Sequence, residues 1–294
     1  MNSKPLLLAA GLVLGSGSAL AQQFDSGIPS GWTCFGNCGT SLTVGGGGVV
    51  SNLSSEYGWV STFGGVEGVS PFPNPPGSPE GGGSGGNTNG SVLRSTAFSA
   101  NADELLQFQF NYVTSDGGTY ADYAWARLLN ANNGSEAAVI FTARTNIDQG
   151  ANVVPGFGLP NPDTVLTPGA VPIIDTGYSP GGDGPKWEPL GNWSGQCWST
   201  GCGYTGWIGA SFKVASSGNY ILEFGVTNWD DQIYDSGMAF NAVTIGNGGG
   251  DDVYIDDDSR HVGPVPEPET YAMMLVGLGM LGLAARRRRM KTAT

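Results

Sequence analysis

Two stretches of the sequence alternate apolar and polar residues with the two-residue period of a β-strand. In residues 104–114 the apolar positions alternate with glutamine and asparagine, and residues 219–227 repeat the pattern with Glu223 on the polar face. The apolar positions are Leu106, Phe108, Phe110 and Tyr112 in the first stretch, and Tyr220, Leu222, Phe224 and Val226 in the second. A strand with one apolar and one polar face is typical of an antiparallel sheet that packs against another layer.

The composition favours many short strands joined by turns. The chain has 50 Gly and 18 Pro in 294 residues, and only 13% of its residues are charged. Further strands are expected at residues 40–50, 57–63, 91–98, 123–129, 137–144, 207–214 and 238–245. Since two sheets can cover each other's apolar faces, these strands predict an all-β fold, a β-sandwich of jelly-roll type.

Two long segments rich in Gly and Pro interrupt the predicted strands. Residues 71–90 have low complexity and are expected to form a surface excursion that packs no core. Residues 145–196 are a second irregular stretch. Because long loops in compact domains are often functional, this second stretch is a candidate for the working surface.

The N-terminus has the three parts of a secretory signal peptide in order. Lys4 precedes an apolar segment at residues 6–14, and Ala19 and Ala21 stand just before Gln22. Residues 1–21 are therefore a predicted signal peptide, cleaved after Ala21. The sandwich is expected to span residues 22–248, and the aspartate-rich residues 249–264 are expected to form an acidic linker.

The C-terminus combines a short motif, an apolar run and a basic cluster. Val265, Pro266, Glu267 and Pro268 precede an apolar run at residues 271–285, which is followed by Arg286, Arg287, Arg288 and Arg289. The run is shorter than the roughly 20 residues that cross a bilayer comfortably, so it predicts a single short transmembrane helix. Basic residues tend to stay in the cytoplasm, which leaves everything before Val265 on the far side of the membrane.

This arrangement closely resembles the PEP-CTERM sorting signal of Gram-negative bacteria that make exopolysaccharide. The resemblance implies that an exosortase cuts near residues 266–268 and removes the helix and the basic tail. The mature protein would then be released or attached at the cell surface or in the extracellular biofilm matrix. An ordinary anchor that is never cleaved is the alternative, but it explains neither the Pro-Glu-Pro box nor the short helix.

Charge and histidine content limit the classes of function. Between residues 22 and 265, Asp and Glu outnumber Lys and Arg by 23 to 6. Nucleic acid is therefore excluded as a partner, whereas cations and neutral or amine-bearing glycans remain open. The one histidine, His261, lies in the acidic linker, so a catalytic Ser-His-Asp or Cys-His arrangement has no base.

The four cysteines form two close pairs in the sequence, Cys34 with Cys38 and Cys197 with Cys202. In an exported protein we expect local disulfides that close two small loops, although four cysteines allow three connectivities. A zinc site built from all four is the alternative, which an oxidising compartment disfavours.

Two loop-and-strand units resemble the signatures of exported "choice-of-anchor" β-sandwich domains. The first covers residues 110–116 and 120–124, and the second covers residues 224–228 and 235–241. The resemblance supports the fold more than a function, because most members lack an assigned activity.

Both units place oxygen-bearing side chains in a turn after an apolar strand. The candidate calcium ligands are Asp116, Asp122, Asn228, Asp231 and Asp235. Calcium takes six to eight such hard oxygen ligands, so one ion could bridge the two units if the strand ends are neighbours. The alternative is that these are ordinary turn residues, because Asp and Asn favour turns.

Aromatic side chains crowd the disulfide-closed region that follows. The candidate ligand-binding residues are Trp187, Trp193, Trp198, Tyr204 and Trp207. Flat side chains can stack on sugar rings, but several tryptophans can equally plug one end of the sandwich.

These observations predict a non-catalytic, exported protein of the cell surface or exopolysaccharide matrix that binds glycan or has a structural role. Its expected partners are the Sec export machinery, exosortase and exopolysaccharide, with calcium as its candidate ion. The alternative is an extracellular glycan hydrolase with a carboxylate pair drawn from Glu223, Asp230, Asp231 and Asp235.

Overall fold

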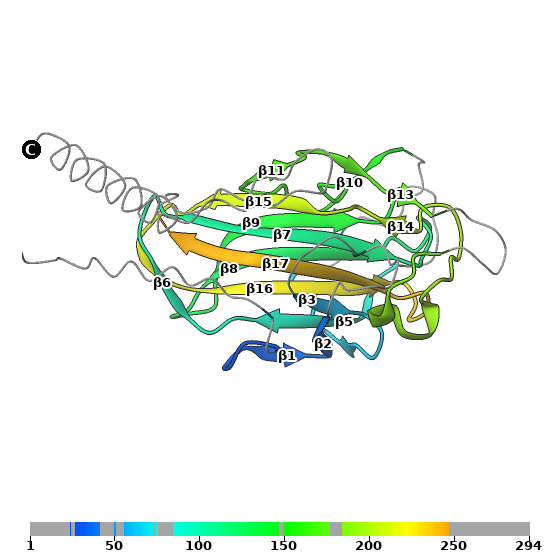
Figure 1. Ribbon diagram of the computed structural model, residues 1–294, viewed down its shortest axis with the longest axis horizontal. Coiled ribbons are helices and arrows are strands. Elements are labelled where there is room, and N and C mark those ends of the chain that lie inside the picture. Colours follow the sequence, from blue (N-terminus) through cyan, green and yellow to red (C-terminus); the bar gives the residue numbers. More distant parts are fainter. Residues whose placement is uncertain are drawn as a thin grey trace, which may run out of the picture. The chain divides into compact units, whose positions relative to one another are not determined.

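The computed structural model describes residues 24, 27–41, 50, 56–72, 75, 85–146, 150–176 and 184–246, and in these residues the protein is almost entirely β-structure (Figure 1). One main sheet has the spatial order β1 (Thr33–Phe35), β5 (Asn87–Arg94), β16 (Gly218–Trp229), β8 (Tyr123–Asn130) and β9 (Glu136–Arg144). In this sheet β4 (Val66–Glu67) pairs with β5, and β6 (Phe98–Ala100) pairs with β16.

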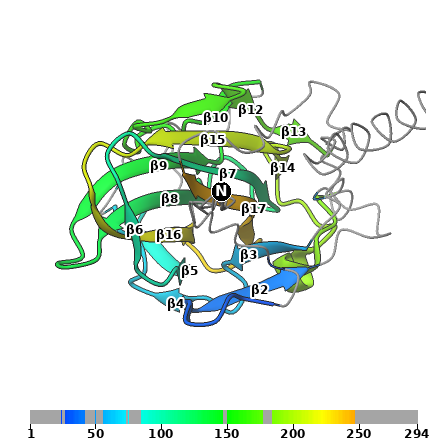
Figure 2. The same cartoon turned by 60° about the vertical axis from the view of Figure 1, so that its left-hand side comes forward.

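The second main sheet has the order β11 (Val165–Thr167), β15 (Ile208–Lys213), β7 (Leu105–Thr114), β17 (Ser236–Gly246), β3 (Tyr57–Ser61) and β2 (Asn37–Ser41). Here β14 (Gly203–Tyr204) pairs with β7 and with β13 (Ile174–Asp175). A two-stranded ribbon of β10 (Asn152–Val154) and β12 (Val171–Pro172) lies near β15 (Figure 2), and the 3-10 helix η1 covers Glu188–Trp193.

The order of the strands is that of a jelly roll. The eight strands of the jelly roll are β5, β16, β8 and β9 in one sheet, and β15, β7, β17 and β3 in the other. Along the chain these eight strands cross between the sheets at every step except from β8 to β9, which are direct neighbours. Their pairings are antiparallel. The predicted jelly-roll β-sandwich is therefore confirmed.

Alternating aromatic side chains fill the space between the sheets. The apolar positions predicted in β7 and β16 are buried. Phe224 stacks on Phe240 with ring centroids 4.0 Å apart and meets Phe108 edge-on at 5.1 Å. Phe110 and Phe141 stack at 3.7 Å. Since each aromatic ring buries a large apolar area, these rings contribute much of the stability of the core.

Loops cover the outer faces of both sheets. The loop that contains Phe72 contradicts the prediction that residues 71–90 pack no core. Phe72 lies in the segment expected to pack no core, yet it is buried against Tyr123 and Trp125 on the outer face of the β8 sheet. The expected loop also ends early, because β5 begins at Asn87. The physical reason is that the outer face of β8 carries two large rings, Tyr123 and Trp125, which need cover from water.

A ladder of charged residues crosses the outer face of the same sheet. Glu223 pairs directly across the strands with Arg94 and with Arg127, and it accepts a hydrogen bond from the indole of Trp125 at 3.0 Å. Burial raises the pKa of Glu223, but the hydrogen bonds and positive charges of its partners outweigh burial and leave the pKa below its ordinary value.

Several expectations concern residues that lie outside those the structure describes. These are the signal peptide at 1–21, the acidic linker at 249–264, the motif at 265–268, the apolar run at 271–285 and the arginines at 286–289. Within the described part of the chain, no helix is long and apolar enough to cross a membrane.

Removal of the Phe224 ring is expected to destabilise the sandwich strongly. Phe224→Ala leaves a cavity between two stacked layers, at a cost of about 3–5 kcal/mol of unfolding free energy. Chemical denaturation measures this loss. Phe35→Ala is the matched control, because the Phe35 ring is 50% exposed. Equal losses in the two variants would contradict the core assignment.

Replacement of Glu223 is expected to weaken the fold at neutral pH more than in acid. The lowered pKa of Glu223 means that its carboxylate stabilises the fold above the ordinary value of 4.5, and that this stability is lost as the pH falls through the lowered pKa. Glu223→Gln should cost about 1–3 kcal/mol at neutral pH, and the difference from wild type should shrink in strong acid. A difference that does not change with pH would show that the charge is not responsible.

Candidate functional site

Three strands end or begin at the same edge of the sandwich. Thr114 at the end of β7 is directly opposite Ser236 at the start of β17, and β16 ends at Trp229 just before the connection to β17. The segments 115–122 and 230–235 therefore leave the sandwich together. Ser115 ties them, because its backbone N–H and its hydroxyl both donate to the carbonyl of Asp235, at 3.1 and 2.8 Å.

Asp122 is a fully buried carboxylate at this edge. Its Oδ1 accepts a hydrogen bond from the backbone N–H of Trp229 at 2.7 Å, and its Oδ2 accepts one from the hydroxyl of Ser236 at 2.6 Å. Burial raises the pKa of Asp122 well above its ordinary value, although these hydrogen bonds oppose the shift. Asp122 thus joins β16 to β17 at the edge where the loops emerge.

Asp116, Asp122, Asp231 and Asp235, called here the acidic cluster, act on one another electrostatically. Burial raises the pKa of Asp116 well above its ordinary value, and the negative charges of Asp122 and Asp231 raise it further. Burial also raises the pKa of Asp235, to about 6. Among the described residues, no three His, Cys, Asp or Glu side chains are already arranged to hold a metal ion.

Asn228 belongs to the same edge of the sandwich. Its side chain opposes the rise in the pKa of Asp235, and its Nδ2 donates to Oδ1 of Asn89 at 3.1 Å. The structure therefore brings the five residues predicted as calcium ligands to one edge. The turn alternative accounts for part of this arrangement, because Asp231 accepts a hydrogen bond from the backbone of Ile233.

A disulfide-closed loop covers the Asp116 turn. Cysteines 197 and 202 are bonded, and cysteines 34 and 38 form the second disulfide, so both local pairings are as expected. The backbone N–H of Trp198 donates to the carbonyl of Ser115 at 3.0 Å. A Cβ on Gly117 would lie 1.8 Å from the Ser199 hydroxyl, so this close approach requires glycine.

Four aromatic rings form a surface beside the acidic cluster, called here the aromatic platform. Trp193 stacks on Tyr234 with ring centroids 4.2 Å apart, Trp198 lies 5.2 Å from Tyr234, and Tyr120 meets Trp198 at 6.4 Å. Trp198 is 44% exposed. Tyr234 adopts a left-handed backbone conformation with φ of 56°, which is uncommon for a bulky residue and often marks a functional position.

The other predicted aromatic residues pack on the sandwich instead. Trp187 is buried on the outer face of the β7 sheet, where its indole donates to the hydroxyl of Tyr57 at 2.9 Å. Tyr204 and Trp207 are partly buried in the same cluster. For Trp187 the packing alternative accounts for the position, since a buried ring cannot stack on a sugar, whereas a ligand-binding role for Tyr204 and Trp207 stays a prediction. Trp193 and Trp198 remain in the candidate surface.

Sequence reasoning did not select Tyr120 or Tyr234 for the candidate surface. Each lies within a few residues of the aspartates, Tyr120 before Asp122 and Tyr234 before Asp235. The signal that could have identified them is an aromatic residue inside an aspartate-rich turn. Their meeting with Trp198, almost 80 residues from Tyr120, depends on the fold.

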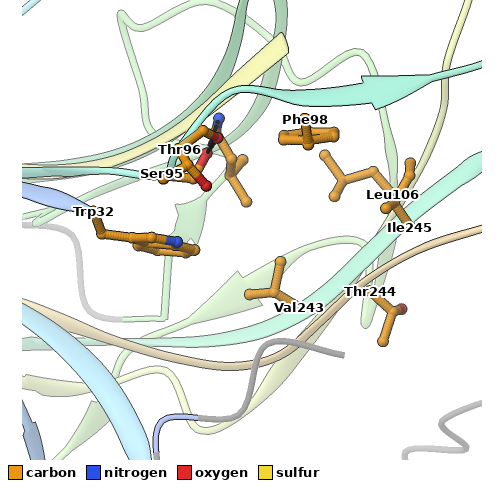
Figure 3. A pocket seen from close by; sticks show the side chains of 9 residues that line it. Trp32, Ser95, Thr96, Phe98, Leu106, Val243, Thr244 and Ile245 are labelled. Carbon is orange, nitrogen blue, oxygen red and sulfur yellow. Dashed lines mark hydrogen bonds between the residues drawn. The ribbon is translucent and has the colours of Figure 1, made fainter. Parts of the chain in front are cut away.

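Figure 3 shows the side chains that line a small apolar pocket. The start of β7 and the end of β17 contribute to this lining, which places the pocket at the opposite edge of the sandwich. It is lined by Trp32, Phe98, Leu106, Leu222 and Val243, together with Ser95, Thr96, Thr244 and Ile245. Leu106 is near the start of β7 and Asp116 follows its end, so about 30 Å separate the pocket from the acidic cluster. The lining contains no charged side chain and therefore offers no acid, base or ion ligand.

Comparison with solved structures gives low similarity. The K1 cleaved adhesin domain of Lys-gingipain from Porphyromonas gingivalis W83 is 10% identical, with a TM-score of 0.37 over 79% of this chain and 100% of that chain. The K3 cleaved adhesin domain of the same protein is 9% identical, with a TM-score of 0.33 over 77% and 97%. The enzymatically active domain of tailspike protein 4 of bacteriophage CBA120 is 12% identical, with a TM-score of 0.30 over 76% and 20%.

These structural similarities are too low to carry an argument about activity or ligands, and no curated protein matches the sequence. One family model matches, the PEP-CTERM protein-sorting motif, at residues 264–289. The match includes the Pro-Glu-Pro box and the four arginines. The motif implies export and membrane-associated processing in a Gram-negative bacterium. The chain thus carries a PEP-CTERM sorting motif and is an exported protein targeted to exosortase.

Proposed function

We propose that the processed protein is a non-catalytic, polysaccharide-binding β-sandwich of the cell surface or exopolysaccharide matrix. The observation that carries the proposal is the aromatic platform of Tyr120, Trp193, Trp198 and Tyr234 at one edge of the sandwich. Three half-buried rings and the exposed ring of Trp198, each held by its neighbours, offer an apolar surface on which the faces of sugar rings can stack.

The charge beside the platform defines the kind of polysaccharide. Asp230 and Asp231 are separated from the loop residues Ile233 and Tyr234 by one residue, and Ile233 is 46% exposed. A negative surface repels anionic polymers and attracts cationic ones, although salt screens this effect. We therefore expect a neutral or amine-bearing polysaccharide rather than one rich in carboxylate or sulfate.

Export and sorting deliver this surface to the polymer. In the proposed sequence, the Sec machinery exports the chain by its signal peptide, the apolar run at 271–285 holds the precursor in the membrane, and exosortase cuts near residues 266–268. The sandwich then acts outside the cell, where disulfides are stable.

A glycan hydrolase is the competing proposal, and the geometry limits its carboxylates. Glu223 is held by Arg94 and Arg127 on the outer face of its sheet. It lies six residues before the end of β16, about 20 Å along the strand from the acidic cluster. The pair would therefore come from the acidic cluster itself. Shortening of the polymer would favour this alternative over binding alone.

Truncation of Trp198 is expected to weaken polysaccharide binding. Trp198→Ala removes an exposed ring of the platform, and we expect a loss of affinity of about tenfold or more, typical of aromatic residues at the centre of a binding surface. The measurement is co-sedimentation of the oxidised segment 22–263 with exopolysaccharide from the source bacterium, followed by size analysis of the polymer.

Phe35→Ala is the matched control, because it removes another exposed ring away from the platform. Chitosan and alginate test the charge preference, and stronger retention on chitosan is expected. Full binding by Trp198→Ala would overturn the platform assignment. A polymer that is shortened by wild type, but not by Asp231→Asn, would replace the binding proposal with hydrolysis.

Substitution of the Pro-Glu-Pro box is expected to block processing. In an exosortase-bearing host, a variant with Pro266→Ala, Glu267→Ala and Pro268→Ala should keep the basic tail and stay in the membrane fraction. Mass spectrometry of the C-terminal peptide identifies the product, and Val262→Ala is the control outside the matched motif. A mature surface form of wild type that still carries residues 286–289 would contradict exosortase cleavage.

A further inference from the structure

Asp116 carries a buried oxygen that lacks a partner. The residue is 1% exposed, and its Oδ1 accepts a hydrogen bond from the backbone N–H of Gly117 at 2.7 Å. Its Oδ2 is buried and has no hydrogen-bond partner in the described part of the chain. A buried carboxylate oxygen that is left unsatisfied is costly, so the turn requires either a proton or a bound group at this atom.

A second buried oxygen at the same edge is also unpartnered. Oδ1 of Asn228 has no hydrogen-bond partner among the described residues, although the amide nitrogen of the same side chain is bonded. Asn228 lies at the same edge as the Asp116 turn. The backbone N–H of Trp229, the next residue, donates to Asp122 at 2.7 Å, and the carbonyl of Asp235 accepts from Ser115, the residue before Asp116.

Negative charges surround Asp116, and a divalent cation would offset more of them than a proton. Asp122, Asp231 and Asp235 all act on Asp116 as negative charges, and Asp122 is itself fully buried. A bound divalent ion would offset several of these charges at once, whereas a proton would offset only one. Hard oxygen atoms of carboxylates and amides are the ligands that calcium prefers.

We propose that a calcium ion binds at Oδ2 of Asp116 and joins the segments 115–122 and 228–235. No three acidic side chains are preassembled in the described residues, so carboxylates alone do not complete the coordination. The amide oxygen of Asn228, main-chain carbonyls and water supply the other ligands, all of which calcium accepts. The inference is independent of polysaccharide binding, because it rests on the buried oxygens and not on the aromatic platform.

The ion would lie beneath the parts that carry the platform. The backbone N–H of Trp198 donates a hydrogen bond to the carbonyl of Ser115, the residue before Asp116. Tyr234 lies between Asp231 and Asp235 in the sequence. An ion that fixes both segments therefore fixes the two rings that meet at 5.2 Å. Calcium removal is accordingly expected to loosen the platform while the rest of the sandwich stays folded.

The test starts with protein that has been treated with chelator and dialysed. Isothermal titration with calcium chloride should show saturable binding, and saturating calcium should raise Tm by roughly 5–10 °C. Terbium is a second probe of the same site, because tryptophans lie near it. We expect terbium emission excited through tryptophan, and we expect calcium to suppress it.

Asp116→Asn tests the assigned ligand. The substitution keeps the shape of the side chain and removes a buried charge, so without calcium the variant should be at least as stable as wild type. Its calcium affinity should fall at least tenfold and its Tm shift should disappear. The control Asp103→Asn changes an aspartate whose side chain is 80% exposed and should leave both readouts unchanged.

Two results would overturn the proposal. One is wild-type protein that shows neither calcium binding nor calcium-suppressed terbium emission at roughly millimolar ion, the weak end of extracellular calcium sites. The other is Asp116→Asn that binds calcium as tightly as wild type. The terbium measurement on wild type applies even if the variant does not fold. Neither readout uses polysaccharide, so failure here is distinguishable from failure of the proposed function.

Discussion

The whole structure depends on aromatic packing between two sheets. Phe224 from one sheet stacks on Phe240 from the other, and Phe108 closes the layer edge-on. The outer faces are not left bare, because loops lay further rings such as Phe72 and Trp187 over them. A chain with 50 glycines gains little from helix formation, so burial of these rings must offset the conformational entropy that ordering its loops costs.

The same packing sets the position of the candidate site. With β7 and β17 locked in register by their inward rings, Thr114 and Ser236 must face each other, and the two aspartate-bearing segments leave the sheet at one point. Asp122 then links β16 to β17 across that edge. Like charges are held together here because the fold is stabilised elsewhere, an arrangement typical of ligand sites rather than of passive turns.

Alternation was enough to predict the sandwich, because a period of two in β7 and β16 is a local property of the chain. The local disulfides were predicted for the same reason. Trp193 and Trp198 were predicted for the candidate surface, but Tyr120 and Tyr234 were not, because Tyr234 and Trp193 meet only after the sheets have formed. Trp187 was predicted for the ligand-binding surface but is buried. Its burial could not be predicted, because it depends on which face of the sheet its loop covers.

The direction of β17 separates the two surface features of the sandwich. The strand starts at Ser236, beside the acidic cluster, and ends at Gly246, near Thr244 and Ile245 of the apolar pocket. Only an elongated molecule, such as a polymer, is long enough to contact both ends of this strand at once.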